Sequence, residues 1–212
     1  WKPLWGEDGI VIDDHKAYVL HFKTSDDLLV NVHFKLFEDG IGFKYEFPEQ
    51  EDLNELIIDD EKSQFKLTAN HKAWWIPADY DSYEYLYKTN RISEIDSSLV
   101  DGSLLAATTI MEKHAVNTPF TMKTDNGLYI SIHEANLTNY AGMTLRIEDD
   151  KRTLTSSLVT STLNGWKAKV EAPFSTPWRT VQVAQRAGDL IESKLILPAH
   201  LAHLNTQRKA RK

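Results

Sequence analysis

Residues 28–47, LLVNVHFKLFEDGIGFKYEF, decide the fold of this chain. In the first half, apolar side chains recur at every second position, which is the repeat of a strand with one polar and one apolar face. The same alternation returns at residues 42–47, and Asp39-Gly40 lies between the two runs. Asp-Gly between alternating runs is a strong hairpin signal, so we expect two adjacent antiparallel strands. The side chains assigned to one face are Leu28, Val30, Val32, Phe34 and Leu36, and those assigned to the other are Asn31, His33 and Lys35.

Short strands separated by turn signals continue along the rest of the chain. Two of the turns are Asp125-Asn126-Gly127 and Asn164-Gly165, and residues 51–60 are compatible with a loop or a short helix. The chain shows no internal repeat and no long amphipathic helix. This pattern predicts an all-β sandwich of mostly antiparallel strands. The further strands that we expect are residues 17–22, 63–67, 120–123, 128–134, 143–147, 153–162, 166–170, 180–184 and 190–197.

The length and composition fit a single domain with a large core. The chain has 212 residues, of which 42% are hydrophobic, and all-β domains of roughly 200–250 residues are common. We expect one domain over residues 1–198. Residues 199–212 are basic and polar at their end, and we expect them to form a disordered tail.

The charge and the absence of cysteine narrow the function classes. The net charge of −7 opposes nucleic-acid binding, which depends on basic surfaces. No apolar run is long enough to span a bilayer, and no signal peptide is recognisable. The abrupt start at Trp1-Lys2-Pro3 leads us to expect that a leader was removed or lies outside this sequence. With no cysteine the chain forms no disulfides, which suits a periplasmic or surface protein but also many cytosolic ones.

Residues 129–145, YISIHEANLTNYAGMTL, hold the main candidate for a functional side chain. As a strand, this stretch places Glu134 on the side of Ile130 and Ile132, near the strand end, and His133 on the other side. A buried carboxylate needs a cation or strong donors. Glu134 is therefore a functional acid, or it forms an ion pair with a nearby Lys or Arg or points to water. The opposite faces of His133 and Glu134 argue against an acid–base pair.

Aromatic residues supply weaker candidates. Six Trp and eight Tyr suit a sugar-binding cleft, but they also fill ordinary β cores. Trp74 and Trp75 alternate faces if extended, so we expect one in the core and the other exposed or at an interface, with sugar stacking as the alternative. Trp178 and Arg179 either anchor a loop by packing and a salt bridge or reach a sugar hydroxyl.

Taken in order, seven short motifs resemble the N-terminal domain of glycoside hydrolase family 97. The resemblance extends over residues 1–197, and the family includes α-glucosidases and α-galactosidases of Bacteroides-type bacteria. One departure is Lys44, where the family often has Arg. The motifs are FEDGIGFKY at 37–45, AWWIP at 73–77, YE at 83–84, TP at 118–119, EANL at 134–137, YAGM at 140–143 and TPWR at 176–179.

This resemblance implies a β-supersandwich similar to galactose mutarotase that lies against a (β/α)8 barrel. The barrel would carry the catalytic residues, so none is expected in this chain, and it would bind an α-linked oligosaccharide. The resemblance also implies that Glu134 is a ligand of an active-site Ca²⁺, expected only with the barrel present, and that the enzyme is periplasmic or surface-associated. No barrel lies within these 212 residues. The alternatives are a stand-alone carbohydrate-binding or scaffold module and, third, a mutarotase-type epimerase.

Overall fold

The computed structural model describes residues 10–51, 53–160 and 165–198. The expected tail, residues 199–212, therefore lies outside the described residues. Besides the strands, the described residues form two short 3₁₀ turns, Ile92–Glu94 and Ser97–Leu99, and the helix α1 (Ala187–Glu192), and residues 196–198 are also helical. The strands are β1 (Lys16–Lys23), β2 (Leu29–Phe37), β3 (Gly40–Phe47), β4 (Glu55–Ile58), β5 (Gln64–Lys66), β6 (Lys72–Trp75), β7 (Lys88–Arg91), β8 (Ala115–Asn117), β9 (Phe120–Lys123), β10 (Tyr129–Ala135), β11 (Met143–Ile147), β12 (Thr153–Leu158), β13 (Ala168–Glu171), β14 (Phe174–Ser175) and β15 (Trp178–Ala184).

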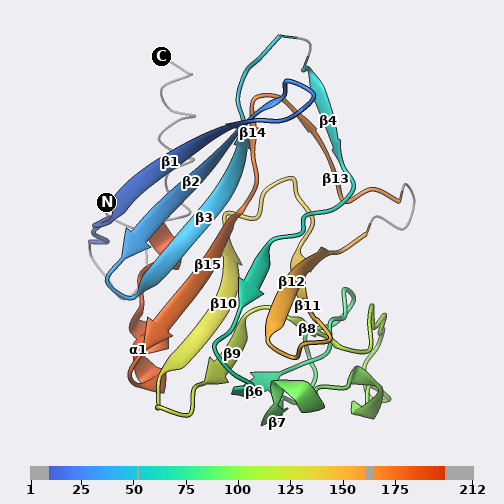
Figure 1. The fold of residues 1–212 in the computed structure, drawn as a ribbon. Helices are drawn as coiled ribbons and strands as arrows, with labels where there is room; N and C mark the ends of the chain where they lie inside the picture. The colour runs from blue at the N-terminus through green and yellow to red at the C-terminus, as the bar shows by residue number, and fades with distance from the viewer. Residues whose placement is uncertain (1–9, 52, 161–164, 199–212) are drawn as a thin grey trace.

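Two sheets of unequal size form the sandwich (Figure 1). The larger is nine-stranded, in the order β1-β2-β3-β15-β10-β9-β6-β7, with β14 paired to β3. The smaller is four-stranded, in the order β5-β12-β11-β8, and β13 and β4 form a separate two-stranded ribbon. Every pairing is antiparallel. The all-β sandwich expected from the sequence is confirmed.

The hairpin of β2 and β3 forms as its alternation predicts. Phe37 lies opposite Gly40, and Phe34 lies opposite Phe43. Gly40 also allows β15 to approach, because a Cβ at this position would lie 2.2 Å from the carbonyl oxygen of Val181. The late strand β15 is thereby inserted between β3 and β10.

The main core lies between the smaller sheet and one half of the larger sheet. Phe120, Ile132 and Met122 from the larger sheet meet Leu145 and Leu154 from the smaller one, and all five are fully buried. β1 and β2 contribute no residue to this core, and β3 contributes only Phe43, which packs at its edge. The smaller sheet therefore covers only part of the larger one.

The prediction of a strand at residues 190–197 was wrong. Residues Ala187–Glu192 form helix α1 instead. Asp189 starts it, because its carboxylate accepts a hydrogen bond from the backbone N–H of Arg186 at 3.1 Å, which satisfies a donor that a helix start leaves free. This local capping outweighs the apolar run that suggested a strand.

Smaller differences concern the ends of elements. The strand expected to reach residue 162 ends at Leu158, and the ambiguous region 51–60 contains β4. Strand β7 was not expected, because its four residues are polar and show no apolar alternation. Within the described residues, no helix is long and apolar enough to cross a membrane.

Candidate functional site

Glu134 lies near the end of β10, where the strand leads into a turn-rich loop. It points to the same face as Ile130 and Ile132, and its cross-strand neighbour on β15 is Arg179. The loop that follows contains Asn136 and Asn139, both with positive φ (58° and 51°), a conformation that asparagine tolerates better than most residues. The Glu134 side chain is 8% exposed. The strand therefore holds this carboxylate at the border between core and surface.

Arg179 is the centre of a buried charge cluster with two carboxylates. Its Nη1 donates to Oε2 of Glu134 at 2.6 Å. Its Nε and Nη2 donate to the two carboxylate oxygens of Glu61 at 2.8 and 2.7 Å. The Arg179 side chain is fully buried. Burial alone would lower the pKa of Arg179, but the hydrogen bonds and charge of Glu61 raise it, so the guanidinium stays charged. The cluster carries one more negative charge than positive when both acids are ionised.

The two carboxylates differ in how completely they are satisfied. Glu61 receives the bidentate contact from Arg179 and two further hydrogen bonds, from the hydroxyls of Ser63 (2.8 Å) and Tyr140 (3.1 Å). Glu134 accepts from Arg179 and from one backbone donor, the N–H of Met143, which lies 3.2 Å from both carboxylate oxygens. A carboxylate has about four acceptor sites. Glu134 therefore keeps acceptor capacity that Glu61 does not.

The electrostatics at Glu134 favour a further cation. Burial raises the pKa of the Glu134 carboxyl, although Arg179 and the Met143 N–H pull it down. Partial burial and the nearby charge of Glu134 also raise the pKa of Tyr83, which remains 56% exposed. A positive charge added beside Glu134 would relieve both effects.

The loop that carries Tyr83 is anchored by Asp79. This buried carboxylate accepts a 2.6 Å hydrogen bond from the hydroxyl of Tyr85 and further bonds from the backbone N–H groups of Asp81, Ser82 and Thr109. Burial and the hydrogen bond to Asp79 raise the pKa of Tyr85 to about 12. The loop is thus fixed where Tyr83 lies close enough to Glu134 to sense its charge.

The residues fit a calcium ion only as a partial site. Calcium takes six to eight oxygen ligands, and within the described ranges no group of three or more His, Cys, Asp or Glu side chains could hold a metal ion. Glu134 offers one carboxylate with spare acceptor capacity, at the border of the core. The described part of the chain can therefore supply one ligand, and the others would have to come from elsewhere.

The weaker candidates have mostly structural positions. Trp75 is buried in the core, whereas Trp74 is half-buried and stacks on Tyr129 with ring centroids 6.2 Å apart. Trp178 is buried, and the amines of Lys35 and Lys44 lie 5.6 and 5.4 Å from its ring. Burial lowers the pKa of Lys44. Trp74, Trp75 and Trp178 do not line either of the two cavities described below.

His133 lies on the opposite face of β10 from Glu134, beside Thr180 of β15. Its buried Nδ1 has no hydrogen-bond partner within the described structure, and neither does the hydroxyl of Thr180. Burial lowers the pKa of His133, which keeps the ring neutral. An acid–base pair of His133 and Glu134 is thus excluded by the strand geometry, as expected.

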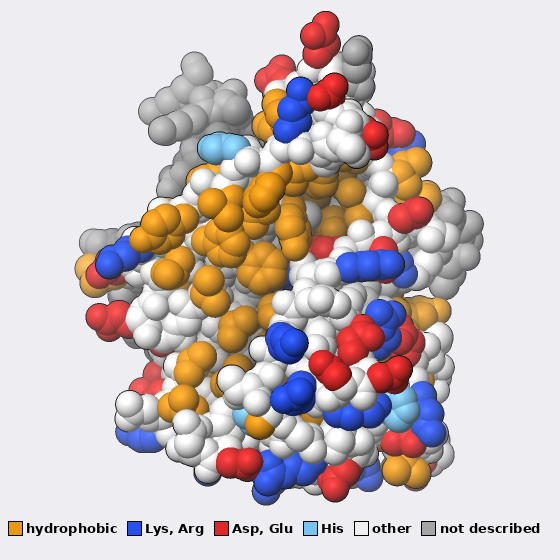
Figure 2. Space-filling view, viewed as in Figure 1, with side chains coloured by type: hydrophobic (Ala, Val, Ile, Leu, Met, Phe, Trp, Pro, Cys, Tyr) orange, Lys and Arg blue, Asp and Glu red, His pale blue; other side chains and the backbone are white. Residues whose placement is uncertain are grey.

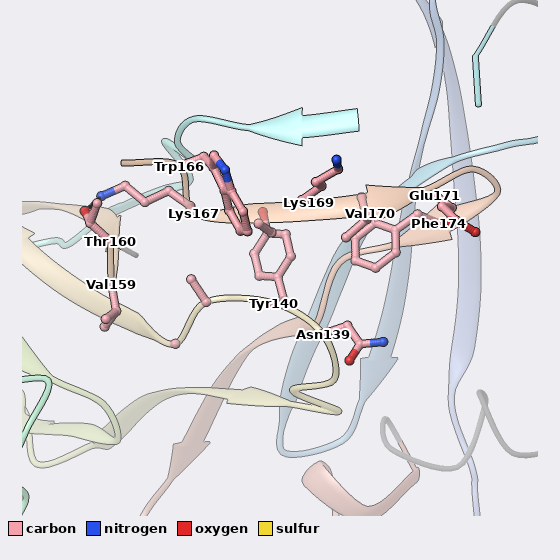
Figure 3. Close-up of a pocket in the computed structure, with 13 residues that line it drawn as sticks. Asn139, Tyr140, Val159, Thr160, Trp166, Lys167, Lys169, Val170, Glu171 and Phe174 are labelled. Carbon is pink, nitrogen blue, oxygen red and sulfur yellow. Dashed lines mark hydrogen bonds between the residues drawn. The ribbon is translucent and has the colours of Figure 1, made fainter. Parts of the chain in front are cut away.

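A cavity of about 750 Å³ adjoins the loop after β10 (Figure 3). Tyr140, Trp166 and Phe174 line it, and the rings of Tyr140 and Phe174 stack with centroids 5.9 Å apart. Asn139 and Lys169 add polar groups to its wall. A second cavity of about 300 Å³ is lined by Tyr140 and Glu61 among others. Tyr140 therefore connects the aromatic cavity to the charge cluster.

Sequence reasoning missed Glu61 and the aromatic cavity. Glu61 follows the acidic residues 59–60 in a segment without periodicity. The available signal was indirect: Arg179, next to the apolar Trp178, was expected to form a salt bridge, but the sequence does not show with which acid. Trp166 was noted only as the start of a strand.

Two unequal antiparallel sheets with a carboxylate cluster between them define the class: a β-supersandwich domain. A family model described as "Glycosyl-hydrolase 97 N-terminal" matches residues 1–200. The chain belongs to glycoside hydrolase family 97, as the N-terminal domain of its enzymes.

Solved structures agree with this assignment. A family 97 enzyme from Pseudoalteromonas sp. strain K8, in complex with acarbose, is 34% identical over 94% of this chain, with a TM-score of 0.78. A variant of that enzyme in complex with panose gives a TM-score of 0.76 at the same identity. The match covers 28% of the Pseudoalteromonas chain in both cases. A β-arabinopyranosidase shares the fold at 14% identity, with a TM-score of 0.55 over 81% of this chain and 31% of its own.

Proposed function

We propose that this chain is the non-catalytic N-terminal domain of an α-glycoside hydrolase. It lies against a (β/α)8 catalytic barrel, forms part of the wall of the substrate cleft and provides Glu134 as one ligand of an active-site calcium ion. The observation that carries this proposal is the asymmetry of the charge cluster, in which Glu61 is saturated and Glu134 is not. Membership of family 97 supports this proposal, since the matched relatives are longer enzymes of which this chain covers 28%.

Arg179 positions Glu134 for this role. A flexible glutamate would lose rotamer freedom on binding a metal ion, whereas the contacts with Arg179 and Met143 already fix its orientation. Calcium, when bound, would polarise a substrate or hold the charges of the site. The chain itself contributes one oriented carboxylate and the Tyr83 loop beside it.

We propose α-glucosides as the substrate class. The support is that the 34% identical Pseudoalteromonas enzyme was solved with acarbose and with panose, which are both built on α-linked glucose-like rings. The test is a comparison of hydrolysis of 4-nitrophenyl α-glucoside and α-galactoside by the complete enzyme. Faster galactoside hydrolysis would contradict this part of the proposal.

The metal role is tested by Glu134→Gln in the complete enzyme. Calcium is removed with a chelator and titrated back while α-glucosidase activity is followed. The variant should need about tenfold or more calcium for half-maximal activity, because a neutral amide is a weaker ligand than a carboxylate.

Glu46→Gln is the matched control. Glu46 is a partly buried carboxylate on the other face of the larger sheet, where it accepts hydrogen bonds from Asn31 and His33. The same chemical change at that position should leave the calcium titration as in the unmodified enzyme. If Glu134→Gln and the unmodified enzyme give the same calcium dependence and the same activity, the metal role is wrong.

A stand-alone carbohydrate-binding module is the second candidate. The aromatic cavity favours it, because Tyr140, Trp166 and Phe174 offer ring faces beside polar groups. Isothermal titration of the 212-residue chain with maltooligosaccharides and galactosides distinguishes the two. Binding by the chain alone, abolished by Trp166→Ala, supports the module; no binding supports a domain that depends on its barrel.

We also propose a periplasmic or cell-surface location. It rests on the family resemblance and accords with the absence of cysteine. Fractionation of the native host followed by immunoblotting tests it, and recovery in the cytosol would contradict it.

A further inference from the structure

Glu61 takes up most of the hydrogen bonds that Arg179 donates in the charge cluster. It accepts from Nε and Nη2, the two groups along one side of the guanidinium, at 2.8 and 2.7 Å. Glu134 accepts from Nη1, at 2.6 Å, and does so with Oε2. The other oxygen of Glu134, Oε1, receives a longer contact of 3.2 Å from the backbone N–H of Met143. This division of the donors between two acids leaves Oε1 with spare acceptor capacity.

Glu61 is held in this position from its own side of the sandwich. Its backbone carbonyl accepts from the hydroxyl of Ser156 on β12 at 2.5 Å, which fixes the segment before β5 to the smaller sheet. Its carboxylate accepts from the hydroxyls of Ser63 and Tyr140 at 2.8 and 3.1 Å. The ring of Tyr140 also lies against Arg179, whose guanidinium carbon is 5.7 Å from the ring centroid. A buried carboxylate is therefore kept beside the guanidinium by contacts from several segments.

The position of Arg179 limits where its donors can turn. Its side chain is fully buried, and its cross-strand neighbours on the larger sheet are Phe43 on β3 and Glu134 on β10. A phenylalanine ring offers no conventional hydrogen-bond acceptor. Figure 2 shows mainly hydrophobic side chains over the upper part of the molecule, where β1, β2 and β3 lie. Glu134 is therefore the acceptor next to Arg179 in the sheet to which Nε and Nη2 would turn without Glu61.

The two acids thus compete for one guanidinium. Buried N–H groups need acceptors, and a guanidinium pairs most favourably with a carboxylate through two parallel hydrogen bonds. Without the carboxylate of Glu61, Arg179 would form such a bidentate pair with Glu134 and occupy Oε1 as well as Oε2.

We propose that Glu61 is a positioning residue for the calcium site. It holds two donors of Arg179 and so keeps Oε1 of Glu134 open to the metal ion. In this role Glu61 acts through Arg179 and is not itself a ligand. The inference rests on the proposed function, because it needs Glu134 to bind calcium.

Calcium binding to the complete enzyme tests the proposal. Calcium is removed with a chelator, and isothermal titration then gives the dissociation constant for calcium of the unmodified enzyme and of Glu61→Gln. The variant should bind calcium at least about tenfold more weakly, because Arg179 then pairs with both oxygens of Glu134. A crystal structure of the calcium-free variant should show this bidentate pair. Glu46→Gln is the matched control at another partly buried carboxylate, and it should bind calcium as the unmodified enzyme does.

A second variant separates the hydrogen bonds of Glu61 from its charge. Glu61→Asp keeps the negative charge but shortens the side chain by one methylene, so the carboxylate no longer reaches both Nε and Nη2 of Arg179. It should weaken calcium binding about as much as Glu61→Gln does. If Glu61→Asp binds calcium like the unmodified enzyme, the charge alone is sufficient and the positioning role is overturned.

Tyr140→Phe covers the case in which the Glu61 variants fail to fold. It removes the hydroxyl that donates to Glu61 and leaves the ring beside Arg179. The loss of this one hydrogen bond should weaken calcium binding by about twofold to fivefold. Calcium binding equal to that of the unmodified enzyme would overturn the positioning role.

Glu134→Gln in the same titration distinguishes this inference from the proposed function. If Glu134→Gln weakens calcium binding and Glu61→Gln does not, the positioning role is wrong and the metal role stands. If Glu134→Gln leaves calcium binding unchanged, the metal role is wrong whatever Glu61→Gln does, and the positioning role falls with it.

Discussion

The two halves of the larger sheet carry similar apolar side chains, but these side chains differ in how far they are exposed to solvent. In the covered half, Phe120 and Ile132 lie against the smaller sheet and are fully buried. In the open half, Tyr18 and Leu20 remain about half exposed. Burial of apolar area, at about 25 cal/mol per Å², therefore stabilises the covered half more than the open half within the described structure. The difference teaches that pairing of the strands does not by itself bury their side chains. The strands of the larger sheet are all hydrogen-bonded, but part of its apolar face stays exposed.

The largest effect on stability is expected at Arg179, where the covered and open halves of the larger sheet meet. Arg179→Met should reduce the free energy of unfolding of the chain by about 3–5 kcal/mol, because Glu61 and Glu134 would stay buried without a cation. Urea unfolding measures it. Arg146→Met is the control, since Arg146 is 41% exposed and bridges Glu148, and its loss should cost less than about 1 kcal/mol. A similar small loss at Arg179 would refute the buried cluster.

Two leucines compare the halves directly. Leu154→Ala in the covered half should reduce the free energy of unfolding by about 2–5 kcal/mol, because Leu154 is fully buried and a cavity would remain. The same change at Leu20 in the open half should cost about 1 kcal/mol or less in the isolated chain. Both are read from urea unfolding. Equal losses would show that the open half is already covered.

A pH titration probes the border of the covered half. His71, just before β6, is buried, and its Nδ1 has no hydrogen-bond partner among the described residues. Burial lowers its pKa, with Asp125 acting in the opposite direction. The folded chain therefore binds fewer protons than the unfolded one, so stability is full above about pH 6.5 and falls as the pH drops below it. The loss should approach about 1.4 kcal/mol per pH unit.

His71→Gln isolates this contribution. Urea unfolding between pH 7.5 and 5 should show a smaller fall for the variant than for the unmodified chain. If the two curves run parallel, another group dominates the pH dependence.

The smallest effect is expected at the exposed end of β1. Lys23 and Asp27 form a 2.6 Å ion pair, with side chains 59% and 82% exposed. Lys23→Ala should change the free energy of unfolding by less than about 0.5 kcal/mol, because solvent screens the pair. A loss of free energy of unfolding above about 1 kcal/mol, measured by urea unfolding, would mean that this ion pair contributes to the stability of the open half.

Local periodicity predicted much of this fold. The alternation in residues 28–47 and the Asp-Gly turn predicted the β2–β3 hairpin and its two faces correctly, because side-chain direction is a local property of a strand. It could not tell that the apolar face is left open, since coverage depends on how far the smaller sheet extends. Helix α1 was missed because one capping aspartate, Asp189, outweighs an apolar run.

Two residues of the candidate site were predicted from the sequence, but their contact with each other was not. The sequence analysis singled out both Glu134 and Arg179, but they lie 45 positions apart in the sequence. Only the pairing of β15 with β10 brings them together. Glu61 could not be predicted, because it lies in a segment without periodicity. Contacts of this kind are set by topology rather than by pattern. The calcium role of Glu134 stays a prediction.

Strand β1 has a consequence for how the domain avoids pairing with other chains while it folds. It is the outermost strand of its sheet, with Lys16 and Lys23 at its two ends, and charged lysines on an edge strand discourage pairing with other chains. N-terminal domains generally fold first during synthesis, and Tyr18, Leu20 and Phe22 of β1 are about half exposed in the described structure. The two lysines oppose pairing of this edge with the strand of another chain, whereas the apolar side chains between them stay exposed.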